Sequence, residues 1–252
     1  MDDQKKKAYV QRVYRSLHNA SDLHYFTIQI RESDLAIGVD KKSYTDGLLS
    51  LCRKELARLR GELEDYIACD PDFRTSLVPI RLLPAAPPIV KSMAAAARLC
   101  NVGPMAAVAG AIAQGIGEKL MDQVQELIVE NGGDIFMHTH RERTIAVFAG
   151  RSRFSQRLGI KVYPEESTLG ICTSSGTVGP SLSFGTADAV LIKSPSAALA
   201  DAAASRAGNI VKTTEDASRA IDAVKDIPGI TGTLIIKDET LAAWGNIELV
   251  PL

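Results

Sequence analysis

Two alanine-rich segments restrict the fold of this chain more than any other feature of its sequence. One follows Pro104 and extends to about Met121, and the other extends from Pro195 to Gly208. A helix that carries small apolar residues on several faces is suited to burial rather than to solvent. Both segments are therefore predicted to be helices whose backbones lie very close to another helix, a sheet or a ligand.

The rest of the chain alternates between strand and helix patterns. Apolar residues two positions apart over 24–30, followed by a second apolar run over 35–39, indicate a hairpin. Apolar residues three or four positions apart over 44–68 indicate a helix with a charged outer face. The run from Tyr9 to Leu17 is also assigned to the N-terminal strands. Further strands are predicted over 126–130, 134–140, 144–149, 159–163, 168–173, 187–193, 232–237 and 246–250, and further helices over 88–100 and 213–228. Ser194 is predicted to cap the second alanine-rich helix, with Pro195 in its first position.

The order of these elements, with no tandem repeat and no clear linker, predicts a single α+β domain over residues 1–252, with helices packed on a mixed sheet. Aromatic residues make up only 5% of the chain, so the core is expected to be aliphatic and rich in alanine. The 29 basic and 30 acidic residues give a net charge of -1, which argues against nucleic-acid binding and against an electrostatic membrane anchor. The near-neutral charge and the alanine-rich helices are compatible with a homo-oligomer.

The cysteines and the hydropathy pattern predict a cytoplasmic protein. None of the 4 cysteines belongs to a Cys-x-x-Cys pair, so they are expected to be reduced thiols. No apolar run of signal-peptide length follows the first residues. Two uncharged stretches, 99–117 and 167–187, contain too much glycine, serine and threonine to span a bilayer.

The first candidate binding segment is Asn131-Gly132-Gly133-Asp134, which follows an apolar strand. Asn-Gly is a strong hairpin signal, so an ordinary tight turn accounts for the segment. The glycines also allow backbone amides to approach an anion or a planar ring. The side chains of Asn131 and Asp134 can bind hydroxyl groups or a phosphate-bound cation. Spacing alone leaves both interpretations open.

The second candidate is a hydroxyl-rich loop over 170–179, in which Thr173, Ser174, Ser175 and Gly176 follow the end of a predicted strand. Backbone amides and hydroxyls in such a loop can bind phosphate. The Gly-Lys-Ser/Thr sequence of a Walker loop is absent. An ordinary flexible loop accounts for the pattern equally well.

The third candidate is the pair Asp201 and Ser205, which are four positions apart in the second alanine-rich helix. Residues at this spacing lie on one helix face, so the carboxylate and the hydroxyl can hold one Mg²⁺ ion together with a phosphate. An exposed aspartate on a helix is the simpler interpretation. The surrounding alanines argue against it, because neither face of this helix is suited to solvent.

Three further features carry weaker interpretations. His138 and His140 point to one side of a predicted strand, as zinc ligands can, but no acidic residue or cysteine has zinc-site spacing to them. Cys172, in the hydroxyl-rich loop, is either a nucleophile or a small buried residue. The basic segment 151–157 is either an anion contact or a solvated loop.

Taken together, these motifs resemble the ApbE superfamily, whose main members are FAD:protein FMN transferases. The resemblance rests on the Gly-Pro-led alanine helix, Val-Glu-Asn-Gly-Gly-Asp, Cys-Thr-Ser-Ser-Gly, and Ala-Asp-Ala with a trailing serine. The segments 102–111 and 170–184 look closer still to a short cytoplasmic ApbE-like branch of anaerobic bacteria and archaea. The resemblance implies that 131–134 and 173–176 lie by a flavin nucleotide, FAD, and that Asp201 and Ser205 hold Mg²⁺.

The chain also departs from true ApbE enzymes. Those enzymes carry Ala-Lys-Gly in the glycine-led helix, where this chain has Ala106-Ala107-Val108. They also carry His-x-x-Asp-Pro-x-Thr-Gly after Thr-Ser-Gly, whereas 181–188 here contains neither the histidine nor the proline. The resemblance therefore implies the fold and the pocket, while flavin transfer stays open.

Two functions follow from this comparison. The first is an ApbE-like enzyme that binds a nucleotide or another diphosphate with Mg²⁺ and carries out transfer or hydrolysis at phosphorus. Its catalytic residues are unknown, and a hydroxyl group of a protein is one acceptor. The second is a non-catalytic accessory protein that holds a cofactor or metabolite for a partner enzyme. The short branch has been linked to sulfide assimilation toward homocysteine, so the resemblance implies a sulfur-pathway partner for this second function.

Overall fold

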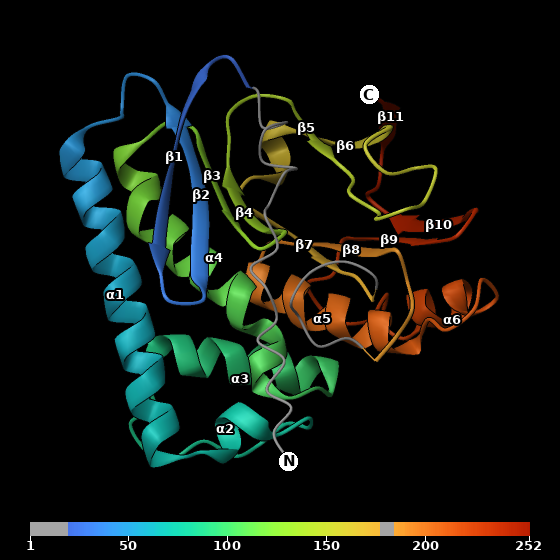
Figure 1. Ribbon diagram of the computed structural model, residues 1–252, viewed down its shortest axis with the longest axis horizontal. Helices are drawn as coiled ribbons and strands as arrows, with labels where there is room; N and C mark the ends of the chain where they lie inside the picture. Colours follow the sequence, from blue (N-terminus) through green and yellow to red (C-terminus); the bar gives the residue numbers. More distant parts are fainter. Residues whose placement is uncertain (1–19, 177–183) are drawn as a thin grey trace, which may run out of the picture.

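The computed structural model describes residues 20–176 and 184–252, and Figure 1 shows helices packed against strands. The predicted strand between Tyr9 and Leu17 lies outside the described residues. The helices are α1 (Asp46–Cys69), α2 (Asp72–Thr75), α3 (Pro88–Cys100), α4 (Val108–Leu120), α5 (Ala197–Ile210) and α6 (Asp216–Asp222), with short 3-10 helices η2 (Pro104–Ala107), η3 (Met121–Gln123) and η4 (Pro164–Glu166). The strands are β1 (Leu23–Ile30), β2 (Ser33–Asp40), β3 (Leu127–Asn131), β4 (Asp134–His138), β5 (Arg143–Ala146), β6 (Leu158–Val162), β7 (Leu169–Ser174), β8 (Ala189–Ser194), β9 (Gly232–Lys237), β10 (Thr240–Gly245) and β11 (Leu249–Pro251).

The strands form two antiparallel sheets within the described part of the chain. The 8-stranded sheet has the order β1-β2-β3-β4-β7-β8-β9-β10, and the 3-stranded sheet has the order β11-β6-β5. Tight turns join β1 to β2, β3 to β4 and β9 to β10, and the helices from α1 to η3 return the chain to the strand next to β2. The predicted α+β class is confirmed. All strand pairs among these residues are antiparallel, so the predicted mixed sheet has no parallel component here. Tight turns reverse the chain in three of these pairs, and longer connections reverse it between the other neighbours in the large sheet.

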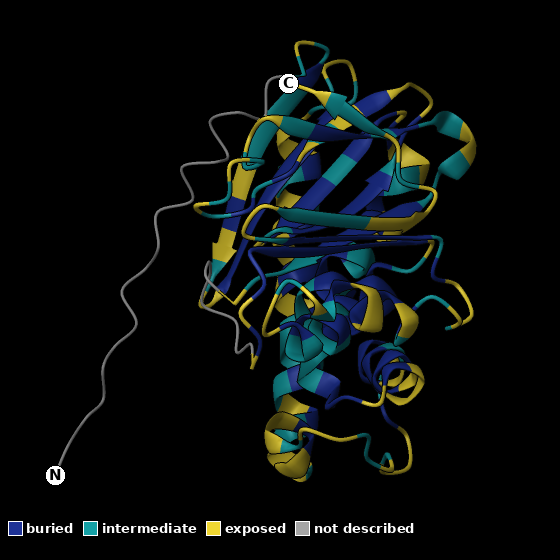
Figure 2. Cartoon of the chain, turned by 90° about the vertical axis from the view of Figure 1, so that its right-hand side faces the viewer, coloured by how far each residue is buried: buried dark blue, intermediate teal, exposed yellow. Residues whose placement is uncertain are grey.

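The large sheet separates two apolar cores. Because side chains alternate between the faces of a strand, β8 directs Val190 and Ile192 toward the helices and Leu191 toward the small sheet. All 6 residues of β8 are buried, as expected for its continuous apolar run. Figure 2 shows the same pattern, with buried residues in the middle strands and exposed residues in the peripheral loops and helices.

The two alanine-rich segments form α4 and α5, and they pack closely as predicted. A Cβ atom at Gly110 of α4 would lie 2.2 Å from the carbonyl oxygen of Ala197, the first residue of α5. A Cβ atom at Gly170 of β7 would lie 2.4 Å from the Cα atom of the same alanine. The start of α5 is therefore held between α4 and β7 at a separation that permits only glycine at these contacts.

The start of α5 differs from the prediction. Ser196 is the N-cap, and its hydroxyl accepts a hydrogen bond from the backbone N–H of Leu199 at 3.3 Å. The predicted cap, Ser194, is instead the last residue of β8, and its hydroxyl accepts a hydrogen bond from the N–H of Ser196 at 3.1 Å. Pro195 thus lies in the link before the helix rather than in its first turn.

The C-terminal strands also differ from the prediction. The predicted strand over 246–250 overlaps only with β11, and β10 was not predicted. The sequence of β10, Thr-Leu-Ala-Ala-Trp-Gly, lacks the alternation of polar and apolar residues that marks a strand.

Within residues 20–176 and 184–252, no single helix is long and apolar enough to cross a membrane. α3 and the segment Pro104–Gln123 meet the length and composition criteria only as a pair bent by 105°.

Candidate functional site

Four segments that are distant in the sequence meet at the N-terminal end of α4. They are the start of α4 itself, the β3–β4 turn, the end of β7 and the first turns of α5. The first N–H groups of a helix have no partners within the helix and carry a partial positive charge. This end of α4 is therefore suited to negatively charged groups.

Asp201 lies in the second turn of α5 and directs its carboxylate toward α4. The backbone N–H of Gly110 donates a hydrogen bond to Oδ2 of Asp201 at 2.9 Å. Ser205 lies one turn later on the same face of α5 and is half-buried. The predicted pair is thus partly accessible, with its carboxylate held by the backbone of the neighbouring helix.

The segment Asn131-Gly132-Gly133-Asp134 forms the β3–β4 hairpin turn. Gly132 and Gly133 have φ angles of 71° and 104°, which favour glycine, so the interpretation as a tight turn is confirmed. The carboxylate Oδ1 of Asp134 accepts a hydrogen bond from the backbone N–H of Thr173 at 3.1 Å. The turn therefore fixes one carboxylate beside the end of β7.

Asn131 connects the hairpin to α4. Its side-chain Nδ2 donates a hydrogen bond to the carbonyl oxygen of Ala109 at 3.1 Å, and the side chain is buried. The adjacent residue, Gly110, binds Asp201. The side chains of Asn131 and Asp201 are thus held by adjacent peptide groups at the start of one helix.

Asp134 and Asp201 form a carboxylate pair in a largely dehydrated environment. Burial and the negative charge of Asp201 raise the pKa of Asp134 well above its usual value. Burial raises the pKa of Asp201 to about 7, although the backbone N–H groups of Gly110 and Ala109 oppose this shift. Within the described residues, neither carboxylate forms a salt bridge. Such a pair is relieved either by protons or by a bound cation.

The raised pKa of this carboxylate pair predicts a pH-dependent stability. The carboxyl groups of the folded protein keep their protons above about pH 4, where the same groups of the unfolded chain release them. The stability that this proton binding contributes is therefore present at low pH and is lost as the pH rises through about 7. We expect the metal-stripped protein to have a lower melting temperature at about pH 8 than at about pH 5.5. Each kcal/mol lost from the free energy of unfolding is expected to lower the melting temperature by about 2–4 °C. The Asp201→Asn variant is expected to show a smaller decrease in calorimetry. An equal decrease in both proteins would contradict this assignment.

The hydroxyl-rich loop reaches the site through its first residues. Thr173 and Ser174 end β7, and the N–H of Thr173 binds the hairpin carboxylate. A Cβ atom at Gly208 would lie 3.1 Å from Oγ of Ser174, so this hydroxyl faces a later turn of α5. Ser175 is half-buried, and the N–H of Gly176 donates to the carbonyl of residue 187 at 2.9 Å. The rest of the predicted loop, 177–179, lies outside the described residues.

Cys172 is a buried thiol next to the carboxylate pair. Its Sγ atom donates to the carbonyl oxygen of Ala197 at 3.2 Å. Burial and the charges of Asp134 and Asp201 raise the pKa of this thiol well above its usual value. This environment favours the interpretation of Cys172 as a small buried residue, since the thiolate is the nucleophilic form.

The burial of Cys172 predicts selective thiol alkylation. Iodoacetamide is expected to modify the exposed Cys69 in the folded protein while Cys172 stays unmodified, as measured by peptide mass spectrometry. In denaturant both residues are expected to react, which provides the control. Rapid modification of Cys172 in the folded protein would restore the nucleophile hypothesis.

His138 and His140 lie at the opposite end of β4 from Asp134. Nδ1 of His138 is 3.2 Å from Oγ of Ser167, and the two histidine rings meet edge to face with centroids 5.0 Å apart. Burial and the neighbouring His140 lower the pKa of His138. The part of the chain that the structure describes contains no group of three or more His, Cys, Asp or Glu residues that could hold a metal ion.

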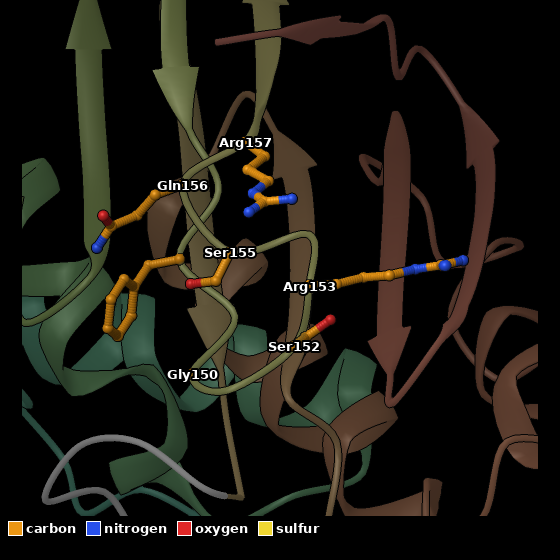
Figure 3. A pocket seen from close by; sticks show the side chains of 7 residues that line it. Gly150, Ser152, Arg153, Ser155, Gln156 and Arg157 are labelled. Carbon is orange, nitrogen blue, oxygen red and sulfur yellow. The ribbon is translucent and has the colours of Figure 1, made fainter.

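The basic segment 151–157 forms a loop beside a cavity of about 330 Å³. Figure 3 shows that Arg153 and Arg157 extend from this loop in different directions. A second cavity, of about 300 Å³, lies between α1, α3 and α4. Neither cavity is lined by the carboxylate pair, so the candidate site rests on its polar contacts rather than on an enclosed volume.

The backbone of Ala109 and Gly110 belongs to the site, although the sequence patterns did not predict it. These peptide groups carry no side-chain chemistry that a motif can reveal. The only signal available was a glycine inside an otherwise helical pattern, which usually has a packing or functional reason.

Comparison with known sequences shows one family over most of the chain. The family model described as AbpE bacteria matches residues 15–230. A UPF0280 protein from Methanocella arvoryzae is 38% identical over 223 residues, covering 88% of this chain and 89% of the archaeal protein. A UPF0280 protein from Methanothrix thermoacetophila is 41% identical over 202 residues, covering 79% of this chain and 84% of that protein.

Comparison with solved structures shows the same fold at low sequence identity. The flavin transferase ApbE from Vibrio cholerae is 12% identical and superposes with a TM-score of 0.57, over 89% of this chain and 97% of that one. The ApbE protein from Thermotoga maritima is also 12% identical, with a TM-score of 0.52 over 89% of this chain and 97% of that one. These likenesses show a shared fold.

Proposed function

This chain belongs to the family described as AbpE bacteria, and on that premise we propose that it binds a nucleotide diphosphate, with FAD as the first candidate, together with Mg²⁺. The bound diphosphate is the site of group transfer or hydrolysis. The proposal places 131–134 and 173–176 beside the nucleotide and assigns Asp201 and Ser205 to the cation.

One observation carries this proposal: the buried carboxylate of Asp134 and the half-buried carboxylate of Asp201 converge on the N-terminal end of α4. Asp134 is held by the N–H of Thr173, and Asp201 is held by the N–H of Gly110. Burial of both groups makes their charged forms costly unless a cation is present. A divalent cation would neutralise the pair, and the helix end would favour the phosphate oxygens.

The side chains at this position fit Mg²⁺ by their chemistry. Asp201, Ser205 and the neighbouring Asp134 supply hard oxygen atoms, which Mg²⁺ prefers. Mg²⁺ binds to proteins through one or two carboxylates and completes its shell with water and substrate phosphates, so a large cage of acidic residues is not required. When bound, Mg²⁺ neutralises the charge that develops on a diphosphate during attack by a hydroxyl or by water.

The remaining residues would bind and orient the ligand. The glycines of the β3–β4 turn leave space beside Asp134, and the hydroxyls of Thr173 and Ser174 supply donors for a phosphate or a sugar. A hydroxyl of a protein acceptor is one possible attacking group. We also propose a cytoplasmic location, which agrees with the free cysteines of the described residues.

The alternative proposal is a non-catalytic accessory protein that holds a cofactor or a sulfur-pathway metabolite for a partner. One observation favours it. The segment Ala106-Ala107-Val108, at the junction of η2 and α4, contains no lysine, although it precedes the peptide groups that hold the site. The site thus lacks this lysine, and the segment 181–188 lacks the histidine that true ApbE enzymes carry there. Such a site can bind a ligand without converting it to a product.

Titration of the metal-stripped protein with FAD, with and without Mg²⁺, tests the proposal. Binding is followed by flavin fluorescence, and release of FMN and AMP is followed by chromatography. We expect Mg²⁺-dependent binding, and we expect Asp201→Ala to weaken it by at least about 10-fold, because loss of a group that only supports a metal ligand already costs about 10–100-fold in affinity. The matched control is Asp222→Ala on α6, which removes an exposed carboxylate that pairs with Lys225.

The three outcomes are distinct. Mg²⁺-dependent binding with product release supports the enzyme, whereas binding without release supports the accessory protein. If the folded protein does not bind FAD even at high excess, the flavin proposal is wrong. The chain would then share only its fold with the ApbE flavin transferases.

A further inference from the structure

The strand β10 forms an open edge of the large sheet. It is the last strand in the sheet order, and it lies at the right-hand side in Figure 1. Its sequence, Thr-Leu-Ala-Ala-Trp-Gly, contains no charged residue and no proline. Edge strands usually carry such residues, or a bulge, because they prevent pairing with another strand. The edge of β10 therefore lacks the ordinary protection against strand addition.

The side chains of β10 also remain accessible. Its first three residues are half-buried and its last three are exposed, and Trp244 has 36% of its surface exposed. Figure 2, which views the molecule from the right-hand side of Figure 1, looks onto this edge. An exposed tryptophan on an unprotected edge is typical of an interaction surface, where aromatic residues are enriched.

The hydrogen-bond register shows which backbone groups point outward. The N–H of Asn246 donates to the carbonyl of Thr231, its register partner, at 2.8 Å. Directly bonded pairs alternate along an antiparallel ladder, so Thr240, Ala242 and Trp244 also bond to β9. The N–H and C=O groups of the residues between them, Leu241 and Ala243, therefore point away from the sheet.

This outward edge is complementary to itself. When two copies of β10 lie antiparallel about a two-fold axis at Ala242, Leu241 of each copy faces Ala243 of the other. Each such pair exchanges two N–H···O=C bonds, which gives four bonds across the axis. The same register places Trp244 opposite Thr240 of the second copy, and no like charges face each other along the strand.

From these observations we propose that this chain forms a two-fold dimer in which the β10 edges of two copies pair and extend the large sheets into one. An edge-to-edge contact of this kind is isologous, so it closes after two copies and does not form a fibre. The residues of the contact are separate from the carboxylate pair, so the dimer does not depend on the proposed ligand.

The single tryptophan of the chain provides a direct measurement. Trp244 is the only tryptophan of the chain, so tryptophan emission, excited selectively against the 6 tyrosines, reports this edge alone. We expect a mass of twice 27.0 kDa in light scattering at high concentration. On dilution to a concentration where mass action favours the monomer, we expect the emission of Trp244 to shift to longer wavelength as the indole becomes exposed.

Two proline variants at matched positions locate the contact. Ala243→Pro removes an outward N–H group without removing a bond to β9, and proline is tolerated at such edge positions. Gln29→Pro provides the control on β1, the strand at the opposite edge of the sheet. Gln29 is exposed, and its backbone N–H points away from β2 because its neighbours in the strand are the residues that bond to β2. We expect Ala243→Pro to be monomeric at concentrations where Gln29→Pro and the unaltered protein are dimeric.

Several results would overturn the proposal. If the unaltered protein is monomeric at all concentrations, β10 does not pair with a second copy of the chain. A dimer that Gln29→Pro dissociates, but Ala243→Pro does not, would place the contact at β1. If circular dichroism shows that Ala243→Pro is unfolded, the dilution experiment on the unaltered protein tests the contact instead. Trp244 emission that stays unchanged while the measured mass halves would reject the β10 contact.

Discussion

Replacement of Gly110 by alanine is expected to lower the free energy of unfolding by about 3 kcal/mol, near the upper end of the usual range for overpacking. The added Cβ atom would lie 2.2 Å from the carbonyl oxygen of Ala197 and 2.9 Å from Cβ of Asp201. The first of these contacts is with backbone, so α4 and α5 must move apart. This movement also lengthens the hydrogen bond from the N–H of Gly110 to Asp201. The Gly110→Ala variant is therefore expected to lose both stability and the geometry of the site.

Urea unfolding measures this effect, and Gly61→Ala is the matched control. Gly61 lies inside α1, and a Cβ atom there would meet nothing within 4 Å. Because glycine is a poor helix former, Gly61→Ala is expected to raise stability by up to about 1 kcal/mol. Equal stability of the two variants would show that α4 and α5 can separate at little cost, which would contradict the close packing described above.

Removal of the Arg143 side chain is expected to have a similarly large effect, about 3–5 kcal/mol, because it leaves a buried carboxylate without its partner. Arg143 forms two hydrogen bonds with the carboxylate of Asp22, at 2.9 and 2.8 Å, and one with Oε2 of Glu126 at 2.7 Å. Although burial opposes it, the hydrogen bonds from Arg143 and Thr139 hold the pKa of Glu126 below its usual value. This network joins the starts of β1, β3 and β5.

Arg141→Ala is the control for this variant. Arg141 approaches Asp22 and Glu126 only at 3.7 and 4.0 Å, and 67% of its side chain is exposed. Exposed ion pairs contribute about 0–1 kcal/mol, so Arg141→Ala is expected to unfold at nearly the urea concentration of the unaltered protein. If Arg143→Ala behaves like Arg141→Ala, the buried network does not hold these strands together.

The sequence predicted most of the elements because their patterns are local. The alternating apolar residues of β1 and the helical spacing of α1 reflect burial on one face, which each segment records in its own residues. The Asn131–Asp134 turn was also predictable, since its glycines are needed for the positive φ angles of the hairpin. β10 was missed because an exposed edge strand needs no regular burial pattern.

The candidate site was only partly predictable. The sequence selected Asp134 and Asp201 by motif and by helix position, but it treated them as parts of separate candidates. It could not show that both carboxylates meet at the start of α4, since positions 134 and 201 lie 67 positions apart along the chain. It also could not show that burial, rather than a hydrogen bond, raises the pKa of Asp201 to about 7.

The α+β class, the alanine-rich helices and the tight turn can be predicted from residue types that are close together along the chain. The position of the start of α5 between Gly110 and Gly170 depends on packing between distant segments, because the absence of two Cβ atoms lets three backbones meet there. The same contact places the carboxylates of Asp134 and Asp201 together in a dehydrated environment, because desolvation depends on everything packed around a group and not on its neighbours in sequence.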